Sequence, residues 1–341
     1  MDLHVLWFVL LGVLLAGYAI LDGFDLGVGI LHLSVRKDEE RRILLNSIGP
    51  LWDGNGVWLV TFGGALFAAF PDAYATVFSG FYTAFMMLLF ALISRAVSIE
   101  FRSKLDTPAW RMFWDVSFCV ASAVATFLFG VAVGNAIHGV PIGADGEFRG
   151  RFVDLLPPYA LLVGCFTVAL FAMHGSIYLY LKTEGELQRK IHGWMWRAFG
   201  FFLVLYLFTT ISTLVDPATA GLATRNFRVH PWMWLVVVLN VLAVANIPRA
   251  IYLGRPGYAF ASSCATIAAL TFLFAVALFP DLIHSSLNPD WSLTIYNAAS
   301  SEKTLAIMAT IAAFGMPFVL TYTSVVYWVF RGKVRLGKLS Y

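Results

Sequence analysis

Length, composition and charge place this chain in a lipid environment. It has 341 residues, of which 60% are hydrophobic and 13% are charged, and its mean hydropathy is +0.77. Soluble domains carry about 25% charged residues, so this chain has too few charges to cover a water-facing surface. The net charge of +3 is small, and the basic residues stand in short runs between apolar segments, which excludes a nucleic-acid partner.

The cysteines and the N-terminus exclude further classes. Cys119, Cys165 and Cys264 all lie inside apolar runs, and none forms a Cys-x-x-Cys. Neither a disulfide framework nor a thiolate metal site is therefore predicted. A cleavable signal peptide is not expected, because Asp2 and His4 precede the first apolar run and no basic segment stands before it.

Nine apolar segments are long enough to span a bilayer, which takes about 20 helical residues. Because lipid offers no hydrogen-bond partners to the backbone, these segments must be helices. The sequence therefore predicts an all-α, polytopic membrane bundle of about nine transmembrane helices in a single integral membrane domain, 1–341. Segment 54–71 is the shortest of them and is rich in glycine. The nine segments are 5–33, 54–71, 77–99, 112–137, 157–181, 197–216, 231–251, 258–280 and 304–330.

The basic residues predict an orientation. Eighteen of the 23 Lys and Arg residues fall in alternate connections and in the C-terminal tail, and only five fall on the opposite side. Such a bias predicts an external N-terminus and a cytoplasmic C-terminus. On the cytoplasmic side, 36–51 is first charged and then apolar, a pattern typical of a short amphipathic helix on the membrane surface.

Two carboxylates lie inside the first predicted span, in AILDGFDLGVG (19–29). Asp22 and Asp25 are three residues apart and share one face of a helix, while Gly23 and Gly27 permit close approach of another helix. Charges inside a span are costly and usually face a bundle interior or a cavity. We interpret the pair as a proton relay or cation site. The structural alternative is a pair of carboxyl groups that hydrogen-bond neighbouring helices.

Another polar group opens the second predicted span, in LWDGNGVW (51–58). Asp53 and Asn55 lie where the chain enters the bilayer, and helix N-termini favour carboxylates. One interpretation is a helix cap with Trp52 and Trp58 as interface anchors. The other is a functional site, in which Asp53 extends the line of Asp22 and Asp25 towards the cytoplasm.

The remaining polar residues give weaker signals. His174 is the histidine well inside a predicted span, and without an axial partner at equal depth it is a poor haem-ligand signal; we expect a packing or hydrogen-bonding role. Residues 100–106, with Arg95 one turn earlier, predict a solvated cytoplasmic collar or a contact to a partner subunit. No nucleotide-binding, nucleophile or zinc motif is found. The acidic line from Asp53 to Asp22 fits a proton-conducting component or a proton-coupled secondary transporter.

At these same positions the chain resembles subunit II of cytochrome bd-type quinol oxidases. The cyanide-insensitive oxidases share this subunit type, and the sequence does not separate the two. The resemblance covers most of the chain and is most specific over residues 21–82, while the middle, near 190–260, diverges. The matching strings are LDGFDLGVG (21–29), ERRILLNSIGPLWDGNGVWLVTFGGALFAAFP (40–71), FSGFY (78–82), FRSKLD (101–106), WRMFWD (110–115), GVAVGNAIHGVP (130–141), TEGEL (183–187) and FPDLIHSSLNPDWSLTIYNAASSEKTL (279–305).

The resemblance implies two four-helix bundles plus one peripheral helix in a bacterial cytoplasmic (inner) membrane. It implies a heterodimer with subunit I, which carries the haems b and d (or b alone) and the quinol site, while this chain ligates no haem and no metal. The complex oxidises quinol and reduces dioxygen to water in the respiratory chain. Some members hold a structural quinone in subunit II, for which no residue is assigned here, and whether a small single-helix subunit joins is left open.

The resemblance also implies roles for the polar residues. Asp53 is implied in a proton path from the cytoplasm to the haems of subunit I, and Asp25 and Asp22 continue or support that path. Trp52 and Asn55 are implied at or near the subunit interface as structural residues. Two alternatives compete: a proton-coupled secondary transporter that uses Asp22, Asp25 and Asp53, and an oxidase that carries its own haem. The lack of matching broken helices in two halves disfavours the transporter, and the missing histidine and methionine pair disfavours the haem carrier.

Overall fold

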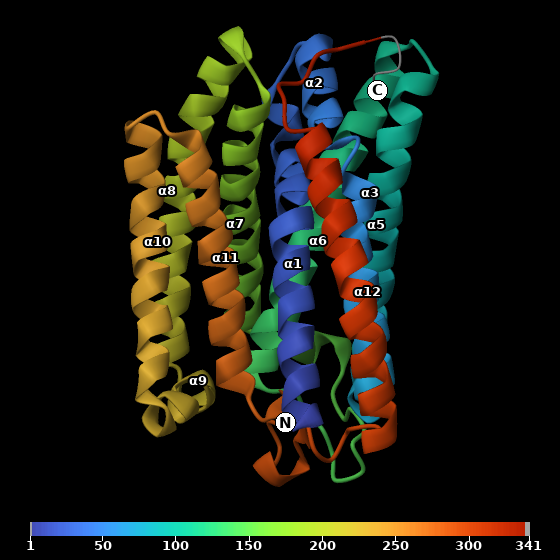
Figure 1. Cartoon of the computed structure of the whole chain (residues 1–341), viewed down its shortest axis with the longest axis vertical. Helices are drawn as coiled ribbons and strands as arrows, with labels where there is room; N and C mark the ends of the chain where they lie inside the picture. Colours follow the sequence, from blue (N-terminus) through green and yellow to red (C-terminus); the bar gives the residue numbers. More distant parts are fainter. Residues whose placement is uncertain (1, 338–341) are drawn as a thin grey trace.

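A computed structural model describes residues 2–337 of the chain. Long helices run side by side along one axis, with the N-terminus at one end of the bundle and the C-terminal tail at the other (Figure 1). In this described part, eight helices are long and apolar enough to cross a membrane. They are α1 (Leu3–Leu31), α5 (Tyr82–Phe101), α6 (Pro108–His138), α7 (Pro158–Lys182), α8 (Gly185–Val215), α10 (Trp234–Tyr252), α11 (Pro256–Leu278) and α12 (Glu302–Val329).

The all-α membrane fold is therefore confirmed, but the predicted count of nine spans is not. The segment predicted at 54–71 is helix α3 (Trp52–Ala69), which has 18 residues and a polar first turn. It lies beside α1 but is not among the eight. The segment predicted at 77–99 is also interrupted, because α4 (Pro71–Gly80) ends just before α5 begins.

The end of the bundle with the C-terminal tail is more helical than hydropathy indicates. Helix α8 begins at Gly185, well before the predicted 197. Hydropathy missed the first turns of this helix because they are charged. The short amphipathic helix predicted within 36–51 is present as α2 (Asp38–Ile48). It buries Leu44, Leu45 and Ile48 in a cluster shared with α1 and α7.

The opposite end carries elements that the sequence did not predict. Helix α9 (Pro217–Val229) lies across the ends of the neighbouring helices (Figure 1). A short antiparallel pair, β1 (Asp281–Ile283) and β2 (Leu293–Thr294), follows α11. Single 3-10 turns complete the connections: η1 (His32–Ser34), η2 (Arg102–Lys104), η3 (Phe152–Leu155), η4 (Pro231–Met233) and η5 (Pro289–Trp291).

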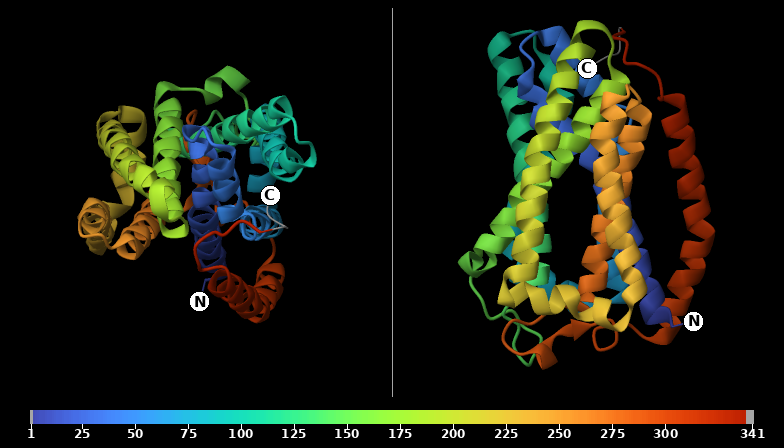
Figure 2. Two further views of the ribbon diagram at one scale, coloured as in Figure 1. Left: turned by 90° about the horizontal axis from the view of Figure 1, so that it is seen from above. Right: turned by 90° about the vertical axis from the view of Figure 1, so that its left-hand side faces the viewer.

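The helices form two groups that meet where α1 and α6 pack against α7. Helices α7, α8, α10 and α11 pack together on one side, and α1, α3, α5 and α6 on the other (Figure 2). The backbones of α1 and α7 approach closely at Gly27 and Gly175, where a Cβ on Gly27 would lie 1.9 Å from the carbonyl oxygen of Phe171. The close approach predicted from Gly23 and Gly27 is thus confirmed, with α7 as the partner.

Helix α12 stands at the edge of the molecule beside α1 and α3 (Figure 2). Only Leu305 of this helix is buried. Its two ends are fastened: Trp7 donates a hydrogen bond at 3.0 Å to the carbonyl of Leu305, and after its last turn the backbone N–H of Val334 donates at 2.9 Å to the carbonyl of Lys182. This arrangement fits the peripheral helix that the resemblance implies.

Candidate functional site

The two carboxylates of α1 lie at the centre of the bundle with different partners. Asp22 is 1% exposed and Asp25 is fully buried. Arg95 of α5 donates two hydrogen bonds to Asp22, at 2.9 Å to Oδ2 and 2.7 Å to Oδ1. Such a forked pair fixes the geometry of both groups and compensates their charges. The predicted position of Arg95 in a solvated collar is wrong, since this side chain is buried inside the span.

Asp25 is instead connected to α3 and α12. The side-chain amide of Asn55 donates a 2.7 Å hydrogen bond to Asp25 Oδ2 and one of 3.2 Å to the carbonyl of Leu21. The hydroxyl of Tyr327 donates to Asn55 Oδ1 at 2.8 Å. Asp25 Oδ1 has no hydrogen-bond partner in the described chain. Asn55 of α3 therefore lies buried where α3 meets α1 and α12, and both ends of its side-chain amide are hydrogen-bonded.

The first turn of α3 brings the second predicted group next to the first. Asp53 lies two residues before Asn55 and is exposed, while Trp52 is half-buried. Because Asn55 bonds to Asp25, this turn is held against the carboxylates of α1. The five residues singled out by the sequence, Asp22, Asp25, Trp52, Asp53 and Asn55, thus lie on two contacting helices.

Another buried carboxylate was not singled out by the sequence. Asp115 of α6 is fully buried and receives hydrogen bonds from three elements: His32 Nε2 at 2.5 Å, Arg41 at 2.8 Å, and Arg102 Nε at 2.6 Å. Arg102 also bonds to Asp38 of α2 at 2.8 Å. The available signal was an aspartate inside the predicted span 112–137. The cluster ties α2 and η2 to the ends of α1 and α6.

The intramembrane histidine has both ring nitrogens engaged. His174 Nδ1 lies 2.7 Å from the hydroxyl of Ser263, and Nε2 lies 3.0 Å from the carbonyl of Ile20. The ring also stacks on Phe260 at 4.9 Å between centroids. These contacts agree with the predicted hydrogen-bonding role. Among residues 2–337, no group of three or more His, Cys, Asp and Glu side chains is arranged to hold a metal ion.

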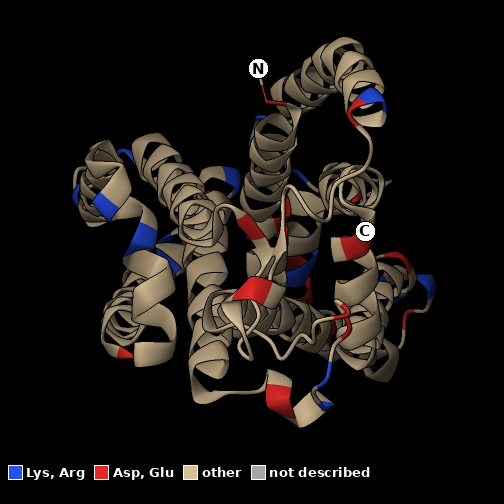
Figure 3. Ribbon diagram, turned by 90° about the horizontal axis from the view of Figure 1, so that it is seen from below, with Lys and Arg blue, Asp and Glu red and all other residues tan. Residues whose placement is uncertain are grey.

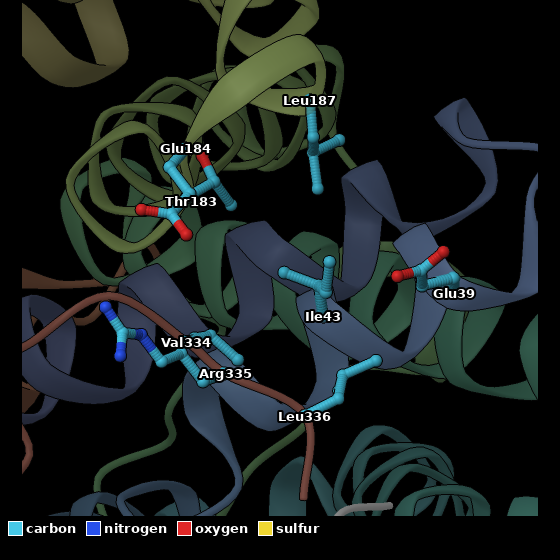
Figure 4. A pocket seen from close by; sticks show the side chains of 8 residues that line it. All are labelled: Glu39, Ile43, Thr183, Glu184, Leu187, Val334, Arg335 and Leu336. Carbon is cyan, nitrogen blue, oxygen red and sulfur yellow. The ribbon is translucent and has the colours of Figure 1, made fainter.

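Charged segments also occur at the rims of the bundle and toward its centre (Figure 3). A cavity of about 320 Å³ lies at the end with the C-terminal tail, between α2, the α7–α8 turn and the tail (Figure 4). Asp22, Asp25 and Asp53 do not line it. Its lining residues are Glu39, Ile43, Thr183, Glu184, Leu187, Val334, Arg335 and Leu336. The buried carboxylates therefore form a separate site, within the packed helices.

Comparisons with known proteins match nearly the whole chain. Residues 3–330 match the family described as cytochrome bd terminal oxidase subunit II. Cytochrome bd-I ubiquinol oxidase subunit 2 of Escherichia coli (strain K12) is 36% identical over 360 residues, which cover 97% of this chain and 95% of that protein. Cytochrome bd ubiquinol oxidase subunit 2 of Bacillus subtilis (strain 168) is 35% identical over 334 residues, covering 98% and 97%.

A solved structure supports the same fold. A chain in the structure of bd oxidase from Geobacillus thermodenitrificans superposes with a TM-score of 0.79, covering 97% of this chain and 99% of that one. The sequence identity in this pair is 17%, so the likeness concerns the fold alone.

Proposed function

The chain belongs to the cytochrome bd terminal oxidase subunit II family, and on this premise we propose that it is the haem-free subunit of a quinol oxidase in the respiratory chain. The complex oxidises quinol and reduces dioxygen to water, with haems b and d, or b alone, held by subunit I. The single observation that carries this proposal is the match over nearly the whole length of the chain and of its relatives. No comparable observation favours a transporter.

His174, the histidine well inside a span, supports a haem-free role. Axial ligation of haem iron takes a ring nitrogen that is free to bind. At His174 both nitrogens are engaged, by the hydroxyl of Ser263 and the carbonyl of Ile20. Binding iron there would break one of these contacts. The haems supply the redox chemistry when bound to subunit I, and this chain supplies packing and proton access.

We further propose that Asp53, Asp25 and Asp22 serve a proton path from the cytoplasmic end of the bundle. Asp53 is the exposed entry, and Asp25 is the buried acceptor next along the path, one of its oxygens being free of protein partners. Asp22 supports the path as a fixed charge, since Arg95 holds both of its oxygens. Carboxyl groups at this depth lower the barrier that hydrocarbon imposes on a proton. Asn55 positions Asp25, and Trp52 lies beside the entry.

The test is the variant Asp53→Asn in the assembled complex. Removing the carboxyl takes away the group that collects protons, so we expect oxygen consumption to fall about tenfold, which corresponds to about 1.4 kcal/mol of barrier. Haem content per complex, measured alongside turnover, should stay unchanged. Asp25→Asn should slow turnover similarly if it assembles.

The matched control is Asp72→Asn. Asp72 is likewise an exposed carboxylate in the first turn of a helix, but it lies in α4, which begins after the end of α3 that is opposite Asp53. We expect this variant to consume oxygen at the wild-type rate. Wild-type turnover in an assembled Asp53→Asn complex would reject the entry role.

A further inference from the structure

A stack of buried polar side chains extends from Asp25 along one face of α1. Tyr18, Asp22 and Asp25 are spaced at i, i+4 and i+7, which places them on the same side of a helix. All three are buried, and Tyr18 is 3% exposed. At 1.5 Å per residue, Tyr18 lies about 10 Å closer than Asp25 to the N-terminal end of α1.

Two atoms of this stack, and one of the neighbouring Arg95, lack hydrogen-bond partners. Eight buried side-chain nitrogen and oxygen atoms of the described residues are unpartnered, and three of them are the Tyr18 hydroxyl, Asp25 Oδ1 and Arg95 Nε. The three atoms belong to neighbours of Asp22, because Tyr18 and Asp25 flank Asp22 on one face of α1 and Arg95 donates hydrogen bonds to both of its oxygens.

Leaving such atoms unpaired is costly. A buried donor or acceptor without a partner costs about 1–3 kcal/mol, and more when the group is charged. Buried water relieves this cost where a site offers two to four polar partners. The three atoms offer complementary bonds, because the Arg95 Nε–H donates, Asp25 Oδ1 accepts and the Tyr18 hydroxyl does both.

We propose that Tyr18, Asp25 and Arg95 enclose a buried hydration site, and that water held there continues the proton path from Asp25 to the Tyr18 hydroxyl. The site rests on the three unpartnered atoms, and its part in proton transfer rests on the proposed function. A proton that leaves Asp25 moves to the adjacent water along a hydrogen bond, that water passes one of its own protons to the Tyr18 oxygen, and the Tyr18 hydroxyl releases its original proton towards the haems that consume it. Asp25 regains a proton from the Asp53 entry. No covalent intermediate is formed, and Arg95 keeps its proton throughout.

Tyr178 of α7 provides an internal comparison. It is as deeply buried as Tyr18, at 4% exposed. Its hydroxyl, however, donates a 2.7 Å hydrogen bond to the carbonyl of Ser47 and has no need of water. The two tyrosines therefore differ in the hydration of the hydroxyl rather than in burial or residue type.

The first experiment is X-ray radiolytic footprinting of the assembled oxidase in ¹⁸O-labelled water. Hydroxyl radicals form from water in place and modify the nearest reactive side chain, so a buried tyrosine is oxidised only where water is held. We expect Tyr18 to incorporate ¹⁸O severalfold faster than Tyr178. Equal or slower modification of Tyr18 would overturn the hydration site.

The second experiment is Tyr18→Phe, which removes the hydroxyl and keeps the ring against Phe129, 5.3 Å away between centroids. We expect oxygen consumption to fall about threefold, less than 1 kcal/mol of barrier, with unchanged haem content. The control Tyr178→Phe should leave turnover unchanged. Wild-type turnover in Tyr18→Phe, with Tyr18 labelled in the parent complex, would overturn the extension of the path to this residue.

The two proposals fail in different ways. If Asp53→Asn is slow but Tyr18 is not labelled, the entry role stands and the hydration site is rejected. If Tyr18 is labelled but Asp53→Asn and Asp25→Asn both turn over at the wild-type rate, the site exists and the proposed proton path is rejected, and with it the role of Tyr18 in that path.

Discussion

The pairing of Asp22 with Arg95 gives two neighbouring carboxylates of one helix different chemical roles. Asp22 accepts two hydrogen bonds from a guanidinium, which hold both of its oxygens in place. Asp25, three residues away, receives one neutral hydrogen bond and has a free oxygen. A group that exchanges protons needs such an incomplete set of partners, so Asp25 is better suited than Asp22 to carry a proton.

This ion pair should be strongly coupled in stability. Removing one partner leaves an uncompensated buried charge, which costs about 3–5 kcal/mol, whereas replacing both by apolar residues is often neutral. We therefore expect Asp22→Leu and Arg95→Leu each to lower the melting temperature and the yield of the complex, and the double variant to recover most of the loss. The measurement is thermal unfolding of the purified complexes.

The outcome that contradicts this coupling is additivity. If the double variant loses as much stability as the sum of the two single variants, the two side chains act independently and the ion pair does not hold α5 against α1. If the double variant regains stability, any remaining loss of turnover reports what Asp22 and Arg95 contribute to the proposed proton path, because Asp25, Asn55 and Asp53 are unchanged in it.

Sequence reasoning found the carboxylates of this site but not all of their partners. Asp22 and Asp25 stood out because charge inside an apolar run is costly. Arg95 did not, because it lies near the end of an apolar segment, where hydropathy cannot tell a buried arginine from a solvated one. Asp115 was missed because its partners, His32 and Arg102, come from other parts of the chain. Lateral pairing between helices is set by packing, which the linear pattern does not record.

At the scale of helices, the crossing of α1 and α7 depends on glycine. A Cβ on Gly27 would lie 1.9 Å from the carbonyl oxygen of Phe171 and 2.9 Å from the Cα of Gly175. Both contacts are to backbone, so no side-chain rotation can relieve them. The same crossing places His174 of α7 against the carbonyl of Ile20 in α1. The position of Asp22 and Asp25 relative to the second helix group therefore depends on this close approach.

Gly27→Ala should destabilise the subunit and reduce its assembly. Overpacking typically costs 1–3 kcal/mol, and since the obstacle is backbone we expect about 3 kcal/mol, seen as a lower melting temperature and a lower yield of haem-bearing complex. The control is Gly12→Ala in the same helix, where an added Cβ meets nothing within 4 Å. That variant should be neutral or stabilising by up to about 1 kcal/mol. Equal behaviour of the two variants would show that the crossing tolerates a side chain.

Hydropathy predicted the helices where they are apolar and missed them where they are charged. Helix α8 extends from its apolar part through Glu186 and Arg189 to Gly185. Helix α9 was missed because it is short and polar enough to read as a loop, with Arg225 and Arg228 in its sequence. Helix α2 was predicted because its charges and apolar residues are segregated along the chain. The break between α4 and α5 falls at Phe81, directly after Ser79 and Gly80, and this turn signal was passed over because the flanking residues are apolar.

At the scale of the whole molecule, the described helices gather the basic connections at one end of the bundle, which the charge bias predicts to be the cytoplasmic end. The tail, α2 and the basic turns after α5 and α7 lie at one end, and α9 with the β1–β2 pair lies at the other (Figure 1). Eight of the described helices can span the membrane, and α3 lies beside α1. If α3 also crosses, the number of spans is odd; if it does not, the number is even. Opposite locations of the two termini, as the charge bias predicts, need α3 to cross.

Two single-cysteine variants test this orientation. Ser103→Cys places a thiol in the exposed turn η2 at the end with the tail, and Ser286→Cys places one in the exposed loop after β1 at the other end. Both changes exchange one small side chain for another and alter no charge, so they leave the basic bias intact. In intact cells, a membrane-impermeant maleimide should label Ser286→Cys and not Ser103→Cys, and permeabilised cells should label both. The native cysteines Cys119, Cys165 and Cys264, present in both variants, are replaced by alanine so that each signal has one source.

Labelling of Ser103→Cys alone in intact cells would invert the orientation and move Asp53 to the external side, where it could not collect protons from the cytoplasm. Labelling of both variants in intact cells would place the two loops on the same, external side of the membrane. It would exclude an odd number of spans between Ser103 and Ser286.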